Sequence, residues 1–165
     1  MTSLYQKILV PYDFSLPSCN ALDQAMKIAK LCRRENSIVE VFILHILEEI
    51  HLPPSFDYGM KIVPPGIEIK STKEHLKKLY HEMKLKTLEL LSEKKKIFET
   101  KGISIVPQVL VGKPNQQIKD FALSKKVDLI VVGAISLKGI QKIKTLGSVS
   151  RKIAEEAKCP VMIVH

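Results

Sequence analysis

The sequence predicts an α/β fold, in which helices flank both faces of a five-stranded, mainly parallel sheet to form a three-layer sandwich. Two observations support this prediction. Short apolar, β-branched runs alternate along the chain with segments whose apolar residues recur at helical spacing. Strands and helices that alternate in this way form parallel sheets with right-handed crossovers. The 165 residues, 45% of them hydrophobic, can bury a sizeable core, so we expect one domain over residues 1–165.

The first part of the chain predicts two buried strands with a helix between them. Residues 7–11 (KILVP) form a short apolar strand. Ser15 and Pro17 then supply the capping residue and the early proline that mark a helix start, and apolar residues follow at helical spacing as far as Cys32. Residues 38–47 (IVEVFILHIL) are apolar and partly β-branched, which predicts the second strand.

A long insertion separates the second predicted strand from the third. Residues 48–71 are rich in proline and glycine, and they predict a long loop of the kind that is usually functional or mobile. Helical spacing then runs over about residues 72–100 and ends at Gly102. A helix of this length either bends or extends past the sheet.

The rest of the chain predicts three further strands. Residues 103–111 form the third strand, and Pro107 inside it indicates an edge position or a bulge, because proline cannot donate a hydrogen bond to a neighbouring strand. The remaining predicted elements alternate as helix 116–124, strand 127–132, helix 149–157 and strand 160–165.

Residues 128–150 (DLIVVGAISLKGIQKIKTLGSVS) contain the ingredients of a phosphate site. The fourth strand stops at Gly133, a loop with Gly139 and several lysines follows, and Gly147 and Ser148 open the last helix. Glycines let backbone N–H groups approach a ligand closely, and a helix start adds unpaired donors and a partial positive charge. Ser148 can donate to a phosphate or cap the helix, because both roles use the same geometry.

Further candidates follow the other predicted strands. Ligands of open parallel sheets bind beyond the carboxyl ends of the strands. Asp13 follows the first strand, Ile46 lies near the end of the second, and Gly112 follows the third. Asp13 can accept hydrogen bonds from a ribose or adenine, or it can be a turn or cap aspartate. We expect a structural role for His45. The convergence of these positions supports a ligand site more strongly than any one of them.

Composition narrows the classes of partner. The net charge of +9 favours anionic partners, but the lysines are spread over helix-like segments without interleaved aromatic residues, so nucleic acid is not the expected partner. No apolar run approaches the ~20 residues that span a bilayer, and we expect a cytoplasmic protein without membrane association. The cysteines lack CxxC spacing and the histidines form no HxxxH pair, so we expect no disulfide framework and no metal site.

Several segments together resemble the universal stress protein family. They are KILVPYDFS at the start, FILHIL in the second strand, VGKP before the third helix, DLIVVG in the fourth strand and LGSVSRKIAEEAKCPVMIV at the end. The resemblance covers nearly the whole chain. It implies a Rossmann-like sheet of the adenine-nucleotide alpha-hydrolase type, a homodimer and a regulatory role in stress responses. Some members of the family bind ATP through a Gly-x2-Gly-x9-Gly-(Ser/Thr) loop, and others do not.

The resemblance carries binding roles onto matching residues. Asp13 matches an aspartate that meets the nucleotide, and Ile46 matches a residue that contacts adenine. Gly133 matches the first loop glycine, and Gly147 and Ser148 match the closing pair. The implied ligand is ATP or another adenine nucleotide, with Mg²⁺ as its accompanying cation. The complete set of predicted nucleotide-binding residues is Pro11, Asp13, Ile46, Gly112, Gly133, Ser136, Gly139, Gly147, Ser148 and Val149.

The family resemblance also implies that residues 160–165 pair with their own copy across a dimer axis. An apolar edge strand needs such cover, because its unpaired backbone groups otherwise invite pairing with other chains. The sequence contains no GxSxG, P-loop or GxGxxG motif and no positioned general base. We therefore expect a binding protein with at most slow ATP hydrolysis.

Two departures from the family's loop keep a second hypothesis open. Ser136 replaces the second glycine, and ten residues, 137–146, follow it where the family pattern has nine. Serine adopts a positive φ at a cost of roughly 1 kcal/mol or more, whereas the extra residue can let the loop reroute with Gly139 taking part. The alternative is a dimeric interaction protein of the same fold, with a degenerate site and an unidentified protein partner.

Overall fold

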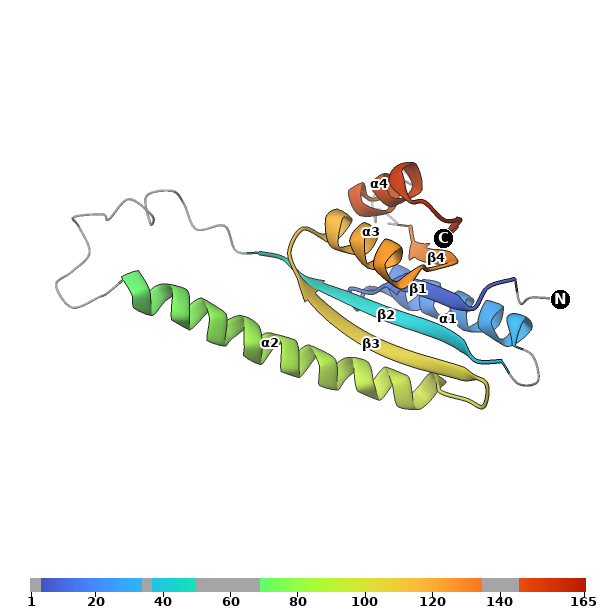
Figure 1. Cartoon of the computed structure of the whole chain (residues 1–165), viewed down its shortest axis with the longest axis horizontal. Helices are drawn as coiled ribbons and strands as arrows, with labels where there is room; N and C mark the ends of the chain where they lie inside the picture. The colour runs from blue at the N-terminus through green and yellow to red at the C-terminus, as the bar shows by residue number, and fades with distance from the viewer. Residues whose placement is uncertain (1–3, 34–36, 50–68, 135–145) are drawn as a thin grey trace, which may run out of the picture.

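The computed structural model describes residues 4–33, 37–49, 69–134 and 146–165 (Figure 1). Strands and helices alternate along the chain, as the sequence predicts. In chain order they are β1 (Lys7–Pro11), α1 (Leu16–Cys32), β2 (Val39–Leu47), α2 (Ile69–Phe98), β3 (Ile103–Val111), α3 (Pro114–Lys125), β4 (Leu129–Gly133), α4 (Ser148–Glu156) and β5 (Val161–Val164).

The five strands form one parallel sheet in the order β3-β2-β1-β4-β5. β1 lies at its centre, where Leu9 is level with Phe42 of β2 and with Ile130 of β4. The chain moves outward from β1 to β2 and β3 on one side, and it later adds β4 and β5 on the other side. The strand order therefore reverses between β1 and β4, and ligands of such sheets bind in the crevice at this point.

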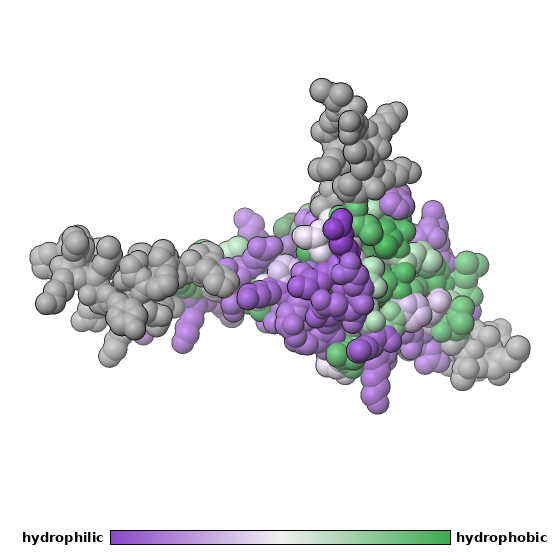
Figure 2. All heavy atoms as spheres, turned by 90° about the horizontal axis from the view of Figure 1, so that it is seen from above, coloured by the Kyte–Doolittle hydropathy of each residue, from purple (hydrophilic) through white to green (hydrophobic). Residues whose placement is uncertain are grey.

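Side chains of the sheet point alternately into two cores. Ile8 and Val10 of β1 belong to the core under α1 and α2, whereas Leu9 between them belongs to the core under α3 and α4. Figure 1 shows α3 and α4 on one side of the sheet and α2 on the other. Seen from the side of α4, the outer layer is mostly hydrophilic, and hydrophobic side chains gather beside it (Figure 2). The predicted three-layer α/β fold is confirmed.

Individual residues explain where α1 begins and why β3 lies at the edge of the sheet. Ser15 is the N-cap of α1 and its hydroxyl accepts a hydrogen bond from the N–H of Ser18 at 3.4 Å, which agrees with the predicted helix start. β3 pairs only with β2, with Pro107 level with Ile43, so the predicted edge position is confirmed. The last four elements, α3, β4, α4 and β5, differ from the prediction by only a few residues at their ends.

The insertion between β2 and β3 contains the longest element of the fold. α2 is a continuous helix of 30 residues, and its N-terminal end extends past the sheet (Figure 1). Its C-terminal half packs on the core through Leu88, the fully buried Leu91 and Phe98. Of the two alternatives for its length, the extension is therefore correct.

Most of the predicted loop, residues 50–68, lies outside the described residues. Among the described helices, none is long and apolar enough to cross a membrane.

Candidate functional site

A cavity of about 460 Å³ lies at the carboxyl ends of β1, β2 and β4, where the strand order reverses. The amino-terminal ends of α1, α3 and α4 close its sides, because Pro17, Pro114 and Ser148 line it. Its volume falls in the range of about 300–1,000 Å³ that is usual for small-molecule sites. The predicted site residues that line the cavity are Pro11, Asp13, Ile46, Gly133, Gly147, Ser148 and Val149.

The other predicted site residues are not brought to this cavity by the described structure. Gly112 does not line it, and its φ of +141° serves the turn that leads into α3. Residues with a side chain rarely adopt this φ, so the turn favours glycine for local reasons. Ser136 and Gly139, with the lysines of the same loop, lie outside the described residues.

Asp13 is held in a tight turn before α1. Its Oδ1 accepts hydrogen bonds from the N–H of Ser15, at 3.0 Å, and from the hydroxyl of Ser15. Burial raises the pKa of Asp13, but hydrogen bonds from Ser15 and Ser18 outweigh burial and place its pKa below the ordinary value. Both hydrogen bonds from Ser15 go to Oδ1, and the exposed carboxylate lines the cavity. The turn role and a ligand role are thus compatible.

An aromatic cluster supports the same side of the cavity. The ring of Phe14 contacts the rings of Tyr12 and His45, with centroid separations of 5.1 and 5.3 Å. Phe14 has a φ of +66°, a conformation that costs a non-glycine residue roughly 1–2 kcal/mol. The sequence analysis missed Phe14, because no local pattern reveals a positive φ at a phenylalanine.

Polar contacts orient the two partners of Phe14. The Nδ1 of His45 lies 2.8 Å from the carbonyl oxygen of Tyr12. Since a carbonyl only accepts, the hydrogen bond requires a proton on Nδ1. The hydroxyl of Tyr12 lies 3.1 Å from the Sγ of Cys19, and burial together with this contact raises the pKa of Tyr12. His45 therefore has the structural role that the sequence predicts, at the wall of the cavity.

Backbone contacts build the opposite side of the cavity. A Cβ at Gly133 would lie 2.4 Å from the carbonyl carbon and oxygen of Pro17, because α1 packs directly on the end of β4. The hydroxyl of Ser150, which is 5% exposed, donates to the carbonyl oxygen of Gly133 at 2.8 Å. This bond ties the first turn of α4 to the end of β4. The sequence analysis missed Ser150, although its place on the buried face of α4, three residues before Ile153, was an available signal.

The start of α4 offers free backbone donors to the cavity. Gly147 is the N-cap and makes no side-chain capping hydrogen bond. Ser148 is the first residue of the helix, so the predicted capping role for its hydroxyl is wrong. The first N–H groups of a helix have no partner within it, and they carry a partial positive charge. Gly147, Ser148 and Val149 all line the cavity, so these donors lie where an anionic group can bind.

Metal ligands are not grouped in the part of the chain that the structure describes. No set of three or more histidine, cysteine, aspartate or glutamate side chains there could hold a metal ion. Asp13 and Glu48 are the carboxylates that line the cavity, and either could meet a cation brought by a ligand. The chemistry that these residues can perform is binding: a carboxylate and backbone donors for polar groups, and apolar walls from Leu44, Ile46 and Val132 for a flat ring.

Comparisons with known proteins identify relatives of this chain by sequence and by fold. The sequence model of the universal stress protein family matches residues 4–165. This chain belongs to the universal stress protein family. The universal stress protein YxiE of Bacillus subtilis is 33% identical over 163 residues, which cover 98% of this chain and 100% of that protein. The matched residues therefore include every described helix and strand.

Solved structures of the family share the fold. The Methanocaldococcus jannaschii protein MJ0577 superposes with a TM-score of 0.72 at 25% identity, covering 98% of this chain and 96% of that one. A universal stress protein solved in complex with cAMP has a TM-score of 0.58 at 25% identity, covering 98% of this chain and 97% of that one. At least one relative in this family therefore binds an adenine nucleotide.

Proposed function

We propose that this chain binds an adenine nucleotide in the cavity at the carboxyl ends of β1, β2 and β4, with ATP as the principal candidate, and acts as a regulatory protein in a stress response. The observation that carries the proposal is the convergence of Asp13, Ile46, Gly133 and the start of α4 on one cavity. These groups come from distant parts of the sequence. Their chemistry matches the three parts of a nucleotide.

Each part of the nucleotide has a suitable counterpart. The carboxylate of Asp13 can accept from ribose hydroxyls, and the apolar side chains of Leu44 and Ile46 suit the adenine ring. The unpaired N–H groups at Gly147–Val149 suit the phosphates. The relative that was solved with cAMP supports the choice of an adenine nucleotide. Mg²⁺, when present, would arrive with the phosphates.

Isothermal titration of nucleotide-free protein tests this function. ATP, AMP and cAMP are titrated separately, and ATP is titrated with and without Mg²⁺. We expect saturable heat with at least one of them, and an affinity at least about tenfold weaker in Asp13→Asn. Asp120→Asn is the matched control, because Asp120 is an exposed carboxylate on α3 that does not line the cavity. Folded protein that gives no heat with any of them at high micromolar concentration would refute the proposal.

The second hypothesis is a dimeric interaction protein of the same fold whose site is degenerate. Ser136 and the ten-residue spacing after it favour this hypothesis. A pull-down distinguishes the two. A protein partner that is recovered equally by native chain and by Asp13→Ala, in protein that binds no nucleotide, supports the interaction protein. Loss of the partner with Asp13→Ala supports a nucleotide-dependent role instead.

For either function we propose a homodimer through residues 160–165. β5 is at the edge of the sheet and pairs only with β4, and its Met162 is 37% exposed. An edge of this kind pairs readily with a second copy. Met162→Lys places a charge in the proposed interface, and we expect it to shift the mass measured by light scattering toward the monomer. An unchanged dimer mass would contradict the pairing.

A further inference from the structure

One side of α2 carries an exposed row of large apolar side chains. Leu79, Met83, Leu90 and Ile97 are 43%, 40%, 43% and 69% exposed. At about 100° per residue, the four lie within an arc of about 40°, which is rotated by about 100° from the buried Leu91. We call these four residues the side row. The row is therefore distinct from the face of α2 that packs on the sheet.

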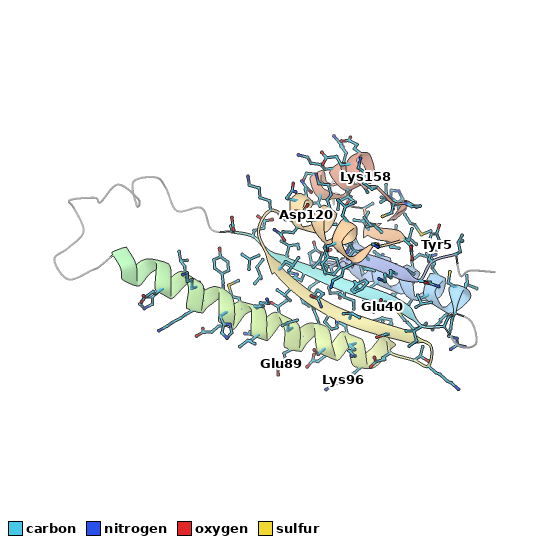
Figure 3. The ribbon with its side chains drawn as sticks, viewed as in Figure 1. Tyr5, Glu40, Glu89, Lys96, Asp120 and Lys158 are labelled. Carbon is cyan, nitrogen blue, oxygen red and sulfur yellow. The ribbon has the colours of Figure 1, made fainter. Side chains whose placement is uncertain are left out.

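The spacing of the side row suits another helix. Met83, Leu90 and Ile97 recur every seven residues, and Leu79 lies four residues before Met83. A seven-residue apolar repeat is the spacing with which helices pack side by side. Leu85, the other large apolar residue exposed in this part of α2, lies on a different face. Glu89 and Lys96 project away from the sheet (Figure 3).

Two opposite charges flank the side row on the same edge. Lys86 and Glu93 are both exposed, and within the described chain neither forms an ion pair. They cannot reach each other easily, because seven residues place them about 10 Å apart along the helix. By contrast, Lys95 and Glu99 are one turn apart and do pair, at 3.5 Å. The lysine and the glutamate beside the row are thus available to an external partner.

We propose that the side row docks against the side row of a second copy of this chain, in an antiparallel arrangement about a two-fold axis at Leu90. In this arrangement Leu90 meets Leu90 of the second copy, and Met83 lies opposite Ile97. The same edge of each helix meets across such an axis, so Lys86 lies opposite Glu93, and the symmetry repeats the pair. The overlap from residue 83 to residue 97 is about 21 Å long.

The self-complementary positions of the charges and the apolar residues favour a second copy of this chain over an unrelated partner. A single register about Leu90 matches Met83, Leu90 and Ile97 with apolar residues of the second copy and forms both charge pairs. An isologous contact requires this self-complementarity, whereas an unrelated partner does not. The contact is separate from the proposed pairing of β5, since α2 packs against β3, and β3 and β5 are the opposite edges of the sheet. It also does not depend on nucleotide binding.

Cysteine cross-linking of the full-length chain tests the arrangement. Leu90→Cys places two thiols at the two-fold axis, so mild oxidation should yield a covalent dimer on a non-reducing denaturing gel. Leu85→Cys is the matched control, because it exposes a cysteine on another face of the same helix. The native chain, with its own three cysteines, gives the background. Denaturation removes any contribution of β5 pairing. Folded Leu90→Cys that cross-links no more than the control overturns the proposal.

Charge reversal tests the register independently. Lys86→Glu and Glu93→Lys each place like charges opposite each other twice, and each should weaken the cross-linkable dimer of the Leu90→Cys chain by about tenfold. The double reversal restores both pairs and should restore cross-linking. Lys78→Glu, an exposed lysine on another face, should have no effect. Equal cross-linking in the single and double reversals would overturn the antiparallel register.

Discussion

The two sides of the cavity are constructed differently. Beside β1 and β2, side chains hold the backbone of nearby turns, as the bonds from the Ser15 N–H to Asp13 and from His45 to the Tyr12 carbonyl illustrate. Beside β4 and α4, backbone approaches backbone, at Gly133. Substitutions on the first side should remove single contacts, whereas substitutions on the second side should displace an element. The predictions below test this difference, from the largest effect to the smallest.

Gly133→Ala should be the most damaging change. The new Cβ would lie 2.4 Å from backbone atoms of Pro17, which cannot move without shifting the start of α1. We expect the free energy of unfolding to fall by about 3 kcal/mol, the upper part of the usual cost of overpacking. Urea unfolding measures it. Gly147→Ala is the control on the same side: its φ of −63° suits alanine, so the loss should stay within about 1 kcal/mol. Equal losses would contradict the backbone explanation.

Ser150→Ala should have an intermediate effect. The half-buried carbonyl oxygen of Gly133 loses its side-chain donor, which should lower the free energy of unfolding by about 1–2 kcal/mol. Because the bond also fixes the start of α4, nucleotide affinity should fall as well. Ser148→Ala separates the two effects: Ser148 is exposed, so its removal should reduce affinity while stability changes by less than about 0.5 kcal/mol. Unchanged stability of Ser150→Ala would show that this hydrogen bond does not stabilise the fold.

The sequence predicts which residues reach the cavity better than it predicts the close backbone contacts beside β4 and α4. Hydrophobic spacing predicts the strands and helices, and parallel topology then brings Asp13, Ile46 and Gly133 to one edge of the sheet. Pro107 also predicts its own edge position. These inferences need only local patterns and one topological rule.

The missed features depend on contacts between distant segments. Gly133 was predicted as a phosphate-loop glycine, but in the structure its lack of a side chain also admits Pro17, more than a hundred residues earlier in the sequence. The bond from Ser150 and the positive φ of Phe14 are likewise set by packing. Gly112 has a φ of +141° in its turn and does not line the cavity, so its predicted ligand role stays a prediction.

Phe14 allows strain to be separated from contact on the side-chain side of the cavity. Phe14→Ala loses both ring contacts and keeps the unfavourable φ of +66°, whereas Phe14→Gly loses the contacts and relieves the φ. We therefore expect the alanine variant to be less stable than the glycine variant by about 1 kcal/mol. Thermal and urea unfolding of the two variants give this difference directly. A glycine variant that is the less stable of the two would show that Phe14 is not strained.

Asp13 should give the smallest effect on stability, and this effect should depend on pH. Burial raises the pKa of Asp13, but the hydrogen bonds from Ser15 and Ser18 set it below the ordinary value of 3.8. A carboxyl whose folded pKa is lowered stabilises the fold above its unfolded pKa, and this contribution is lost as the pH falls through the folded pKa. The amide side chain introduced by Asp13→Asn keeps an oxygen acceptor for the N–H of Ser15 and removes only the charge. Native protein should therefore be slightly more stable than Asp13→Asn in urea at neutral pH, and the gap should close in acid. A gap that persists below the folded pKa would mean that geometry rather than charge holds this turn, which would make the two sides of the cavity more alike than their contacts indicate.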